Sequence, residues 1–205
     1  SSPMKILAIE TSCDDTCIAI LEEKGKELNF LSSVVSSQIE IHREYGGVYP
    51  TLAKREHQKN LVPVLEESLK EANLLESGNS YKDTSKILKR EKGLAKNLKI
   101  FLKKYNKPDI DYLAVTIGPG LDPSLWAGIN FTKALSFAWD IPVIPINHIK
   151  AHFFAPLILK KGEFPAVSLL ASGGHTQLIV SEDLNTHRVI GKTRDDAAGE
   201  CFDKT

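Results

Sequence analysis

Short apolar runs separated by polar turns fill the start of the chain and predict strands. Residues 5–9, 17–21 and 28–35 are such runs, and the polar turn 10–16 separates the first two. Apolar runs of this length, bounded by turn residues, are typical of buried strands. Because the connections are too short for a crossover helix, we expect these strands to form an antiparallel meander.

The middle of the chain alternates between helical and strand patterns. Helices are expected over residues 51–73, 124–139 and 148–159, and strands over 110–117 and 142–146. In the first of these helices, Leu61, Leu65 and Leu69 form one apolar stripe, and Pro63 is expected to kink it. We therefore expect a mixed sheet, opened by the meander, with helices on its faces.

The opening pattern occurs a second time near the end of the chain. A strand, a short polar turn and a returning strand span residues 5–21 and again 166–181, and a further strand follows over 186–192. This repeat predicts two similar lobes. We expect the first lobe over residues 4–147, and over 148–205 a linking helix and the start of a second lobe.

Composition narrows the class of protein. Of the 205 residues 42% are hydrophobic and 25% charged, as in soluble globular proteins, which excludes disordered, collagen-like and coiled-coil classes. The 26 basic and 26 acidic residues cancel, which excludes a globally basic nucleic-acid binder but not a local basic patch. Three cysteines make no disulfide framework, and no apolar run reaches the ~18 residues of a membrane helix. We expect a cytoplasmic protein.

One segment, residues 82–107, differs in charge from the rest. It carries ten Lys or Arg and two Asp or Glu, a local charge of +8. Its apolar residues fall near helical spacing, which predicts a basic amphipathic helix after the loop 76–80. Either the lysines cover a solvent-facing helix surface, as charge runs usually do, or they contact nucleic acid. On a helix, Lys96, Lys99 and Lys103 share one face.

Two histidines are spaced for metal binding. His148 and His152 lie four residues apart, so on a helix that begins after Asn147 they share one face and can bind one metal ion. Packing or chance is the alternative, and a third ligand must come from elsewhere. Zinc proteases use such pairs, but they need a Glu beside the first His, where this chain has Ile149.

Two glycine-containing turns are candidates for holding a phosphate. In the turn 172–176, two glycines allow backbone N–H groups to approach an anion, although an ordinary hairpin would look the same. Residues 118–120 lie between a strand and a helix, where helix N–H groups can face a phosphate, or where the chain simply turns.

Acidic residues gather at two further turns. Asp14 and Asp15 lie in the first hairpin turn, where carboxylates either position magnesium or a water molecule or merely cap the turn. The run 195–204 is a loop that leads into a helix, and its acidic residues are also explained by simple capping of that helix.

Taken together and in order, these segments resemble the TsaD family, the transferases that make N6-threonylcarbamoyladenosine in tRNA. The matching pieces are residues 9–16, 45–50, 55–57, 118–121, the pair His148 and His152, and residues 172–177 and 195–204. The resemblance is to the N-terminal part of a bacterial-type member. It implies an α/β fold of the actin-like, Hsp70-like (ASKHA) class, with the first lobe and the start of the second.

The same resemblance implies a reaction and a site. Family members move the threonylcarbamoyl group from threonylcarbamoyl-adenylate to N6 of adenosine 37, in tRNAs that read codons beginning with A. Carried over, His148 and His152 hold one divalent metal ion, iron or zinc. The adenylate would be bound by Leu170, Ala171, Ser172, Gly173, Gly174 and Asp203. Asp14 or Asp15 would act as the catalytic base or as an electrostatic anchor.

The resemblance also implies partners and shows departures. Expected partners are tRNA, threonylcarbamoyl-adenylate, a paralogous actin-like subunit and a small ATPase, with no membrane. Residues 122–126 replace smaller residues expected after the Gly-Pro-Gly loop, and the basic segment 82–107 looks like an insertion. Family members are longer, so we expect this chain alone to be incomplete as an enzyme. The alternative is a catalytically silent nucleotide-binding scaffold, for which the two histidines would be irrelevant.

Overall fold

The chain divides into two compact units, Ser1–His148 and Ile149–Thr205. The computed structural model describes residues 2–25, 27–159, 163–183 and 186–204. Within these ranges, no helix combines the length and the hydropathy that crossing a membrane requires.

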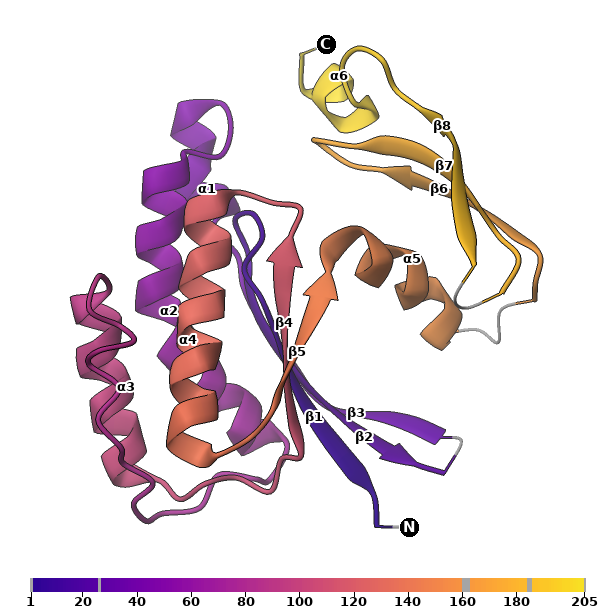
Figure 1. Cartoon of the computed structure of the whole chain (residues 1–205). Coiled ribbons are helices and arrows are strands. Elements are labelled where there is room, and N and C mark those ends of the chain that lie inside the picture. Colours follow the sequence, from indigo (N-terminus) through magenta and orange to yellow (C-terminus); the bar gives the residue numbers. More distant parts are fainter. Residues whose placement is uncertain (1, 26, 160–162, 184–185, 205) are drawn as a thin grey trace. The chain divides into compact units, whose positions relative to one another are not determined.

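A five-stranded sheet forms the centre of the first unit (Figure 1). Its strands are β1 (Met4–Glu10), β2 (Thr16–Lys24), β3 (Glu27–Ser36), β4 (Tyr112–Gly118) and β5 (Val143–Asn147). Strands β1, β2 and β3 pair antiparallel, which confirms the predicted meander. Strand β4 pairs parallel to β1, and β5 pairs parallel to β4, so the order is β3-β2-β1-β4-β5.

Helices cover this sheet and close the hydrophobic core. Helix α2 (Pro50–Glu71) packs on β2 and β3, helix α4 (Asp122–Trp139) packs on β4 and α2, and helix α3 (Lys92–Lys104) packs on α2 (Figure 1). Two short elements, α1 (Ile39–His42) and the 3-10 turn η1 (Arg43–Tyr45), connect β3 to α2. Alternate residues of the central strands point into the core, where Leu7 and Ile18 are fully buried.

The basic helix is shorter than the sequence pattern predicts. Helix α3 begins at Lys92, and the residues before it form a series of turns. The Asp83 carboxylate accepts the Ser85 N–H at 3.0 Å, and backbone bonds three residues apart follow, such as Ile87 N–H to the Thr84 carbonyl. These local side-chain bonds compete with a helix, so the expectation of helix over 82–91 is wrong.

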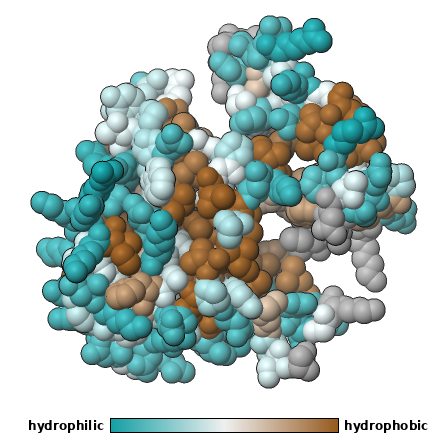
Figure 2. Space-filling view, viewed as in Figure 1, coloured by the Kyte–Doolittle hydropathy of each residue, from teal (hydrophilic) through white to brown (hydrophobic). Residues whose placement is uncertain are grey.

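The second unit contains a second meander. Strands β6 (Ala166–Ala171), β7 (Thr176–Ser181) and β8 (His187–Lys192) pair antiparallel in that order, as predicted. Helix α5 (His148–Leu159) begins at the last residue of the first unit, and helix α6 (Ala198–Lys204) follows β8. Hydrophobic side chains gather on the surface of the second unit in Figure 2. Val167 and Leu169 of β6 are among its exposed apolar residues.

The topology confirms the predicted fold class. In the five-stranded sheet β2 is the strand that runs antiparallel to both of its neighbours, while β1, β4 and β5 run parallel to one another. A meander therefore opens a mixed sheet in the first unit, and a second meander follows α5 in the second unit. This is the predicted α/β arrangement of the actin-like class.

Candidate functional site

Polar side chains from three strands meet at one edge of the five-stranded sheet. Because β1, β4 and β5 are parallel neighbours, their carboxyl ends lie at the same edge. Glu10 is the last residue of β1, Thr116 lies near the end of β4, and His148 directly follows β5. In sheets of this kind, ligands typically bind at the carboxyl ends of the parallel strands.

Glu10 is the centre of this cluster. Its Oε1 accepts the Ser12 N–H at 2.5 Å, and its Oε2 accepts the Thr116 hydroxyl at 2.6 Å and His148 Nδ1–H at 3.2 Å. Burial raises the pKa of Glu10, but hydrogen bonds from His148, Ser12 and Thr116 outweigh it and lower the pKa to about 2. Glu10 is therefore ionised throughout the neutral range.

The contact with Glu10 assigns the tautomer of His148. A carboxylate can only accept hydrogen bonds, so Nδ1 carries the hydrogen and the lone pair of the neutral ring is on Nε2. The Ser12 hydroxyl lies 3.1 Å from the same Nδ1. A carboxylate behind the ring is the usual arrangement for a metal-binding histidine, because it orients the ring and makes the opposite nitrogen a better ligand.

The second predicted ligand, His152, lies four residues further along α5, in the second unit, and is exposed. In the described ranges no group of three or more His, Cys, Asp or Glu side chains is arranged to hold a metal ion. Two imidazoles are donors of the kind that bind a metal ion, and the Glu10 contact orients the His148 ring for this. The described residues nevertheless supply two candidate protein ligands, whereas a catalytic zinc site typically has three.

The turn that carries Asp14 and Asp15 is fixed by a buried histidine of α2. The His57 Nε2–H donates to the Cys13 carbonyl at 3.0 Å, and the Thr16 hydroxyl donates to His57 Nδ1 at 2.8 Å. Burial lowers the pKa of His57, although the Cys13 carbonyl and the carboxylates of the turn oppose this effect. Asp15 Oδ1 is buried and has no hydrogen-bond partner in the described residues.

The Gly-Pro-Gly segment brings α4 against the same hairpin turn. A Cβ added to Gly120 would lie 2.6 Å from the Ser12 carbonyl oxygen, a distance that only glycine avoids. The Leu121 N–H donates to this carbonyl at 2.7 Å, and the Thr11 hydroxyl donates to the Ser124 carbonyl at 2.8 Å. These contacts give the segment a structural role in holding residues 11–12 at the strand ends.

In the second unit, the predicted phosphate turn is closed by its own hydrogen bonds. The Ser172 N–H donates to the His175 carbonyl at 2.8 Å, and the His175 N–H donates to the Ser172 hydroxyl at 3.1 Å. The N–H groups of Gly173 and Gly174 form no hydrogen bond within the described ranges. They are therefore the donors that this turn offers to an anion.

Helix α6 packs directly on this turn. The Gly199 N–H donates to the Ser172 carbonyl at 3.1 Å, and a Cβ on Gly199 would lie 2.8 Å from Gly173 N. Leu170 and Ala171 end strand β6 just before the turn. Asp203 belongs to α6, but its side chain lies outside the described residues.

Three contributors to the site were not singled out from the sequence as functional residues. Glu10 and Thr116 become partners only when β1 and β4 pair, so local sequence carries no sign of their contact. His57 lies in residues 55–57, one of the segments that resemble the family. That position was the one indication in the sequence that His57 contributes to the site.

Comparison with known proteins places the chain in a family. The sequence model described as "TsaD: tRNA N6-adenosine threonylcarbamoyltransferase" matches residues 29–77 and 94–205. The chain is 44% identical to the tRNA N6-adenosine threonylcarbamoyltransferase of Persephonella marina, over 98% of this chain and 48% of that protein. Proteins of the same name from Fusobacterium nucleatum and Bacillus anthracis are 44% and 42% identical, over 98% and 97% of this chain.

Among solved structures, the chain is similar to YeaZ from Pseudomonas aeruginosa, with a TM-score of 0.49 and 14% identity over 93% of this chain and 66% of that one. This chain spans about half the length of the curated relatives that it matches. On the match of the family model and the identity to these relatives, the chain belongs to the TsaD family of tRNA N6-adenosine threonylcarbamoyltransferases.

Proposed function

We propose that this chain takes part in transferring the threonylcarbamoyl group from threonylcarbamoyl-adenylate to N6 of adenosine 37, in tRNAs that read codons beginning with A. The observation that carries this proposal is 44% identity, over 98% of the chain, to a relative with that enzyme name. In the reaction, the N6 amine attacks the carbamoyl carbonyl carbon. A C–N bond forms, the bond from that carbon to the adenylate phosphate oxygen breaks, AMP leaves, and N6 loses one proton.

Glu10, Thr116 and His148, which we call the strand-end cluster, are proposed to orient the His148 ring and to place a negative charge behind it. Ionised Glu10 holds the His148 ring through Nδ1, so that Nε2 faces away from the carboxylate. His148 and His152 would hold one divalent ion, iron or zinc, and that ion would polarise the acyl carbonyl when bound. Glu10 would act behind His148 as a positioning residue.

Asp14 and Asp15 are the proposed groups for the proton lost from N6, or for electrostatic anchoring. Support comes from the buried Asp15 Oδ1, which has no partner within the described ranges. A buried carboxylate oxygen without a donor is costly, which favours a bound substrate donor at this position. His57 would keep the turn in place through the Cys13 carbonyl.

The adenylate is proposed to bind at residues 170–174, with Asp203 contributing from α6. The turn's available donors, Gly173 and Gly174 N–H, support a contact with the adenylate phosphate, because glycine lets an anion approach the backbone closely. Ser172 would shape the turn through its bonds to His175 and not donate its own N–H to the phosphate.

The basic helix α3 is proposed to contact the tRNA. Its exposed Lys99 and Lys103 ammonium groups lie 5.8 and 5.2 Å from the centre of the Tyr81 ring. A group of lysines beside an aromatic ring suits a phosphate backbone with an unstacked base. Further proposed partners are a paralogous actin-like subunit and a small ATPase, and a tRNA-modifying role favours a cytoplasmic location.

The proposal is tested by measuring binding of a non-hydrolysable threonylcarbamoyl-adenylate analogue to the chain by calorimetry. We expect saturable binding that weakens in Gly174→Pro, because proline removes one of the two available N–H donors. Gly93→Ala, in the first turn of α3, serves as the control, because an added Cβ there would meet nothing within 4 Å and the site lies outside the 172–176 turn. Binding that Gly174→Pro leaves unchanged, or no binding at all, would contradict the proposed adenylate turn.

A further test concerns transfer itself. The tRNA is digested after incubation with the acyl-adenylate, and N6-threonylcarbamoyladenosine is measured by mass spectrometry. Analogue binding that does not depend on His148 or His152, together with no modified nucleoside, would instead favour the scaffold alternative.

A further inference from the structure

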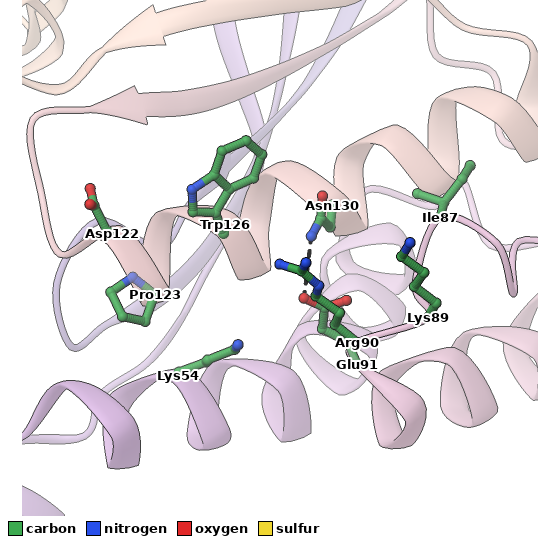
Figure 3. A pocket seen from close by; sticks show the side chains of 9 residues that line it. All are labelled: Lys54, Ile87, Lys89, Arg90, Glu91, Asp122, Pro123, Trp126 and Asn130. Carbon is green, nitrogen blue, oxygen red and sulfur yellow. Dashed lines mark hydrogen bonds between the residues drawn. The ribbon is translucent and has the colours of Figure 1, made fainter.

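A pocket of about 450 Å³ lies on the first unit between α2, α4 and the turns before α3 (Figure 3). Lys54 reaches it from α2, Trp126 and Asn130 from α4, and Arg90 and Glu91 from the turns. The residues of the strand-end cluster and of the 172–176 turn do not line it.

One wall of this pocket holds a buried carboxylate that is only half satisfied. Glu91 is 3% exposed, and its Oε1 accepts the Asn130 amide at 3.2 Å. Its Oε2 has no hydrogen-bond partner within the described ranges. A buried carboxylate oxygen without a donor costs free energy, so this position favours a ligand that brings an N–H group.

The α4 side of the pocket also presents an aromatic ring, one helical turn from Asn130. Trp126 is 52% exposed, which is unusual for so large an apolar side chain, and Figure 3 shows its indole projecting from α4. The Lys133 ammonium lies 5.7 Å from the centre of a Trp126 ring and adds positive charge beside it. An exposed indole of this kind is suited to stacking on a flat heterocycle.

Cationic side chains complete the lining. Lys54, Lys89 and Arg90 surround the pocket, against the carboxylates of Glu91 and Asp122. The excess of positive charge at the rim would attract a phosphate, while the buried Glu91 would face the part of the ligand that donates hydrogen bonds.

We propose that this pocket binds a nucleotide: a base stacked on Trp126, an N–H of its edge donated to Glu91, and its phosphate held by Lys54, Lys89 and Arg90. The nucleotide is either free or an unpaired residue of an RNA. The pocket chemistry is the same for a free nucleotide and for an unpaired residue of an RNA. The RNA version of the proposal rests on the proposed function, and the free-nucleotide version does not.

Much of this pocket is built by a segment outside the family match. The matched stretches end at residue 77 and resume at 94, and Lys89, Arg90 and Glu91 lie in the gap. The gap segment is nevertheless packed, because Leu88 is fully buried in the core. The wall formed by residues 87–91 therefore lies outside the family match, whereas Lys54, Trp126 and Asn130 lie inside it.

The test is titration of the full chain with guanosine 5′-monophosphate, followed by tryptophan fluorescence. Guanine carries N–H donors on one edge, and a base stacked on Trp126 should quench its emission, whereas Trp139 is buried and serves as an internal reference. We expect saturable quenching. Glu91→Gln should weaken the affinity about tenfold or more, because it removes the charged acceptor.

Matched variants separate the pocket from the general positive charge. Lys89→Ala should weaken binding about threefold or more through loss of a phosphate contact, while Lys82→Ala in the same segment should not, because Lys82 Nζ lies near Phe137 and outside the pocket. By calorimetry, Trp126→Ala should lose affinity about tenfold and Phe137→Ala, equally exposed on α4, should not. Equal affinities within either pair, or no quenching by the nucleotide, would overturn the proposal.

An RNA stem-loop with unpaired guanosines distinguishes the two sources. If the stem-loop displaces the free nucleotide from the parent chain, and Trp126→Ala no longer binds the stem-loop in this way, the pocket binds RNA. If the stem-loop does not displace the nucleotide, the pocket binds a free nucleotide. Neither readout uses the acyl-adenylate or its transfer, so this inference and the proposed function fail separately.

Discussion

The two meanders begin alike and differ in what their strands bury. In β1 of the first unit, Leu7 is fully buried, whereas in β6 of the second unit Leu169 is 69% exposed. The first meander is extended by β4 and β5 and covered by α2 and α4. Among the described residues of the second unit, the sheet has three strands, and Ile179 is buried while Val167 and Leu169 remain at the surface.

The difference shows that a repeated sequence pattern does not imply equal stabilisation. Apolar strand residues stabilise a fold only in proportion to the surface that they remove from water. In the first unit the hairpin turn is further held by Glu10, His57 and Gly120. In the second, the turn is held by its own Ser172 bonds and by α6.

The largest expected difference is between one leucine in each meander, Leu7 of β1 and Leu169 of β6. Leu7→Ala should lower the free energy of unfolding of the first unit by about 2–5 kcal/mol, because it leaves a cavity in a closed core. Leu169→Ala should change the free energy by no more than about 0.5 kcal/mol, because its side chain is mostly in water. Urea unfolding followed by tryptophan fluorescence reports the first unit, and hydrogen exchange of β6–β8 reports the second. Equal losses would contradict the comparison.

The next largest effects are expected at two glycines where a helix or loop packs closely against a hairpin turn. Gly120→Ala would push a Cβ against the Ser12 carbonyl and should cost about 2 kcal/mol, measured by thermal unfolding. Gly199→Ala would push against Gly173 and should instead release α6, seen as faster amide exchange in residues 198–204 with the first unit unchanged. If Gly199→Ala also lowered the stability of the first unit, the two hairpin turns would not be held independently of each other.

Glu10→Gln should have a smaller effect that depends on pH. The folded-state pKa of Glu10, about 2, lies below its ordinary value of 4.5, so its contribution is fully present above pH 4.5 and is lost as the pH falls toward 2. At neutral pH we expect a cost of roughly 1–2 kcal/mol, reduced from the full value because the side chain is partly exposed.

The measurement for this variant is urea unfolding at several pH values. The parent and Glu10→Gln should converge as the pH approaches 2. Glu23→Gln, an exposed residue of β2, should follow the parent at every pH. Parallel curves for the parent and Glu10→Gln across that range would contradict the assigned ionisation.

The smallest expected effect is a gain in stability. Gly93 lies in the first turn of α3, and a Cβ added there would meet nothing within 4 Å. Gly93→Ala should therefore stabilise the first unit by about 0.5–1 kcal/mol by reducing the entropy of the unfolded chain. A melting temperature that does not rise would mean that Gly93 adds no conformational entropy to the unfolded chain beyond that of alanine.

The sequence was sufficient for most of the fold. The strand at 5–9, its partners and the second meander followed from apolar runs and turns, because those signals are local. The prediction of a helix over 82–91 was wrong because Asp83 and Thr84 form local hydrogen bonds that favour turns. The spacing of apolar residues alone does not reveal this competition.

The site was less predictable because it depends on contacts between distant residues. Asp14 and His148 could be selected as candidates from their spacing and from the resemblance. The link of Glu10 to Thr116 joins residues 106 positions apart, so it appears only after β1 and β4 pair. The same holds for the Glu91 pocket, which needs α2 and α4 to be packed together.

The central claim is that the strand-end cluster serves threonylcarbamoyl transfer, and a hybrid protein tests it most directly. The 205 residues of this chain would replace the matching half of the Persephonella marina relative, and N6-threonylcarbamoyladenosine would be measured by mass spectrometry of digested tRNA. We expect the hybrid to form the modified nucleoside, His148→Ala to abolish its formation and Glu23→Gln to leave it unchanged. Undiminished modification by the His148→Ala hybrid would show that the cluster does not serve the transfer.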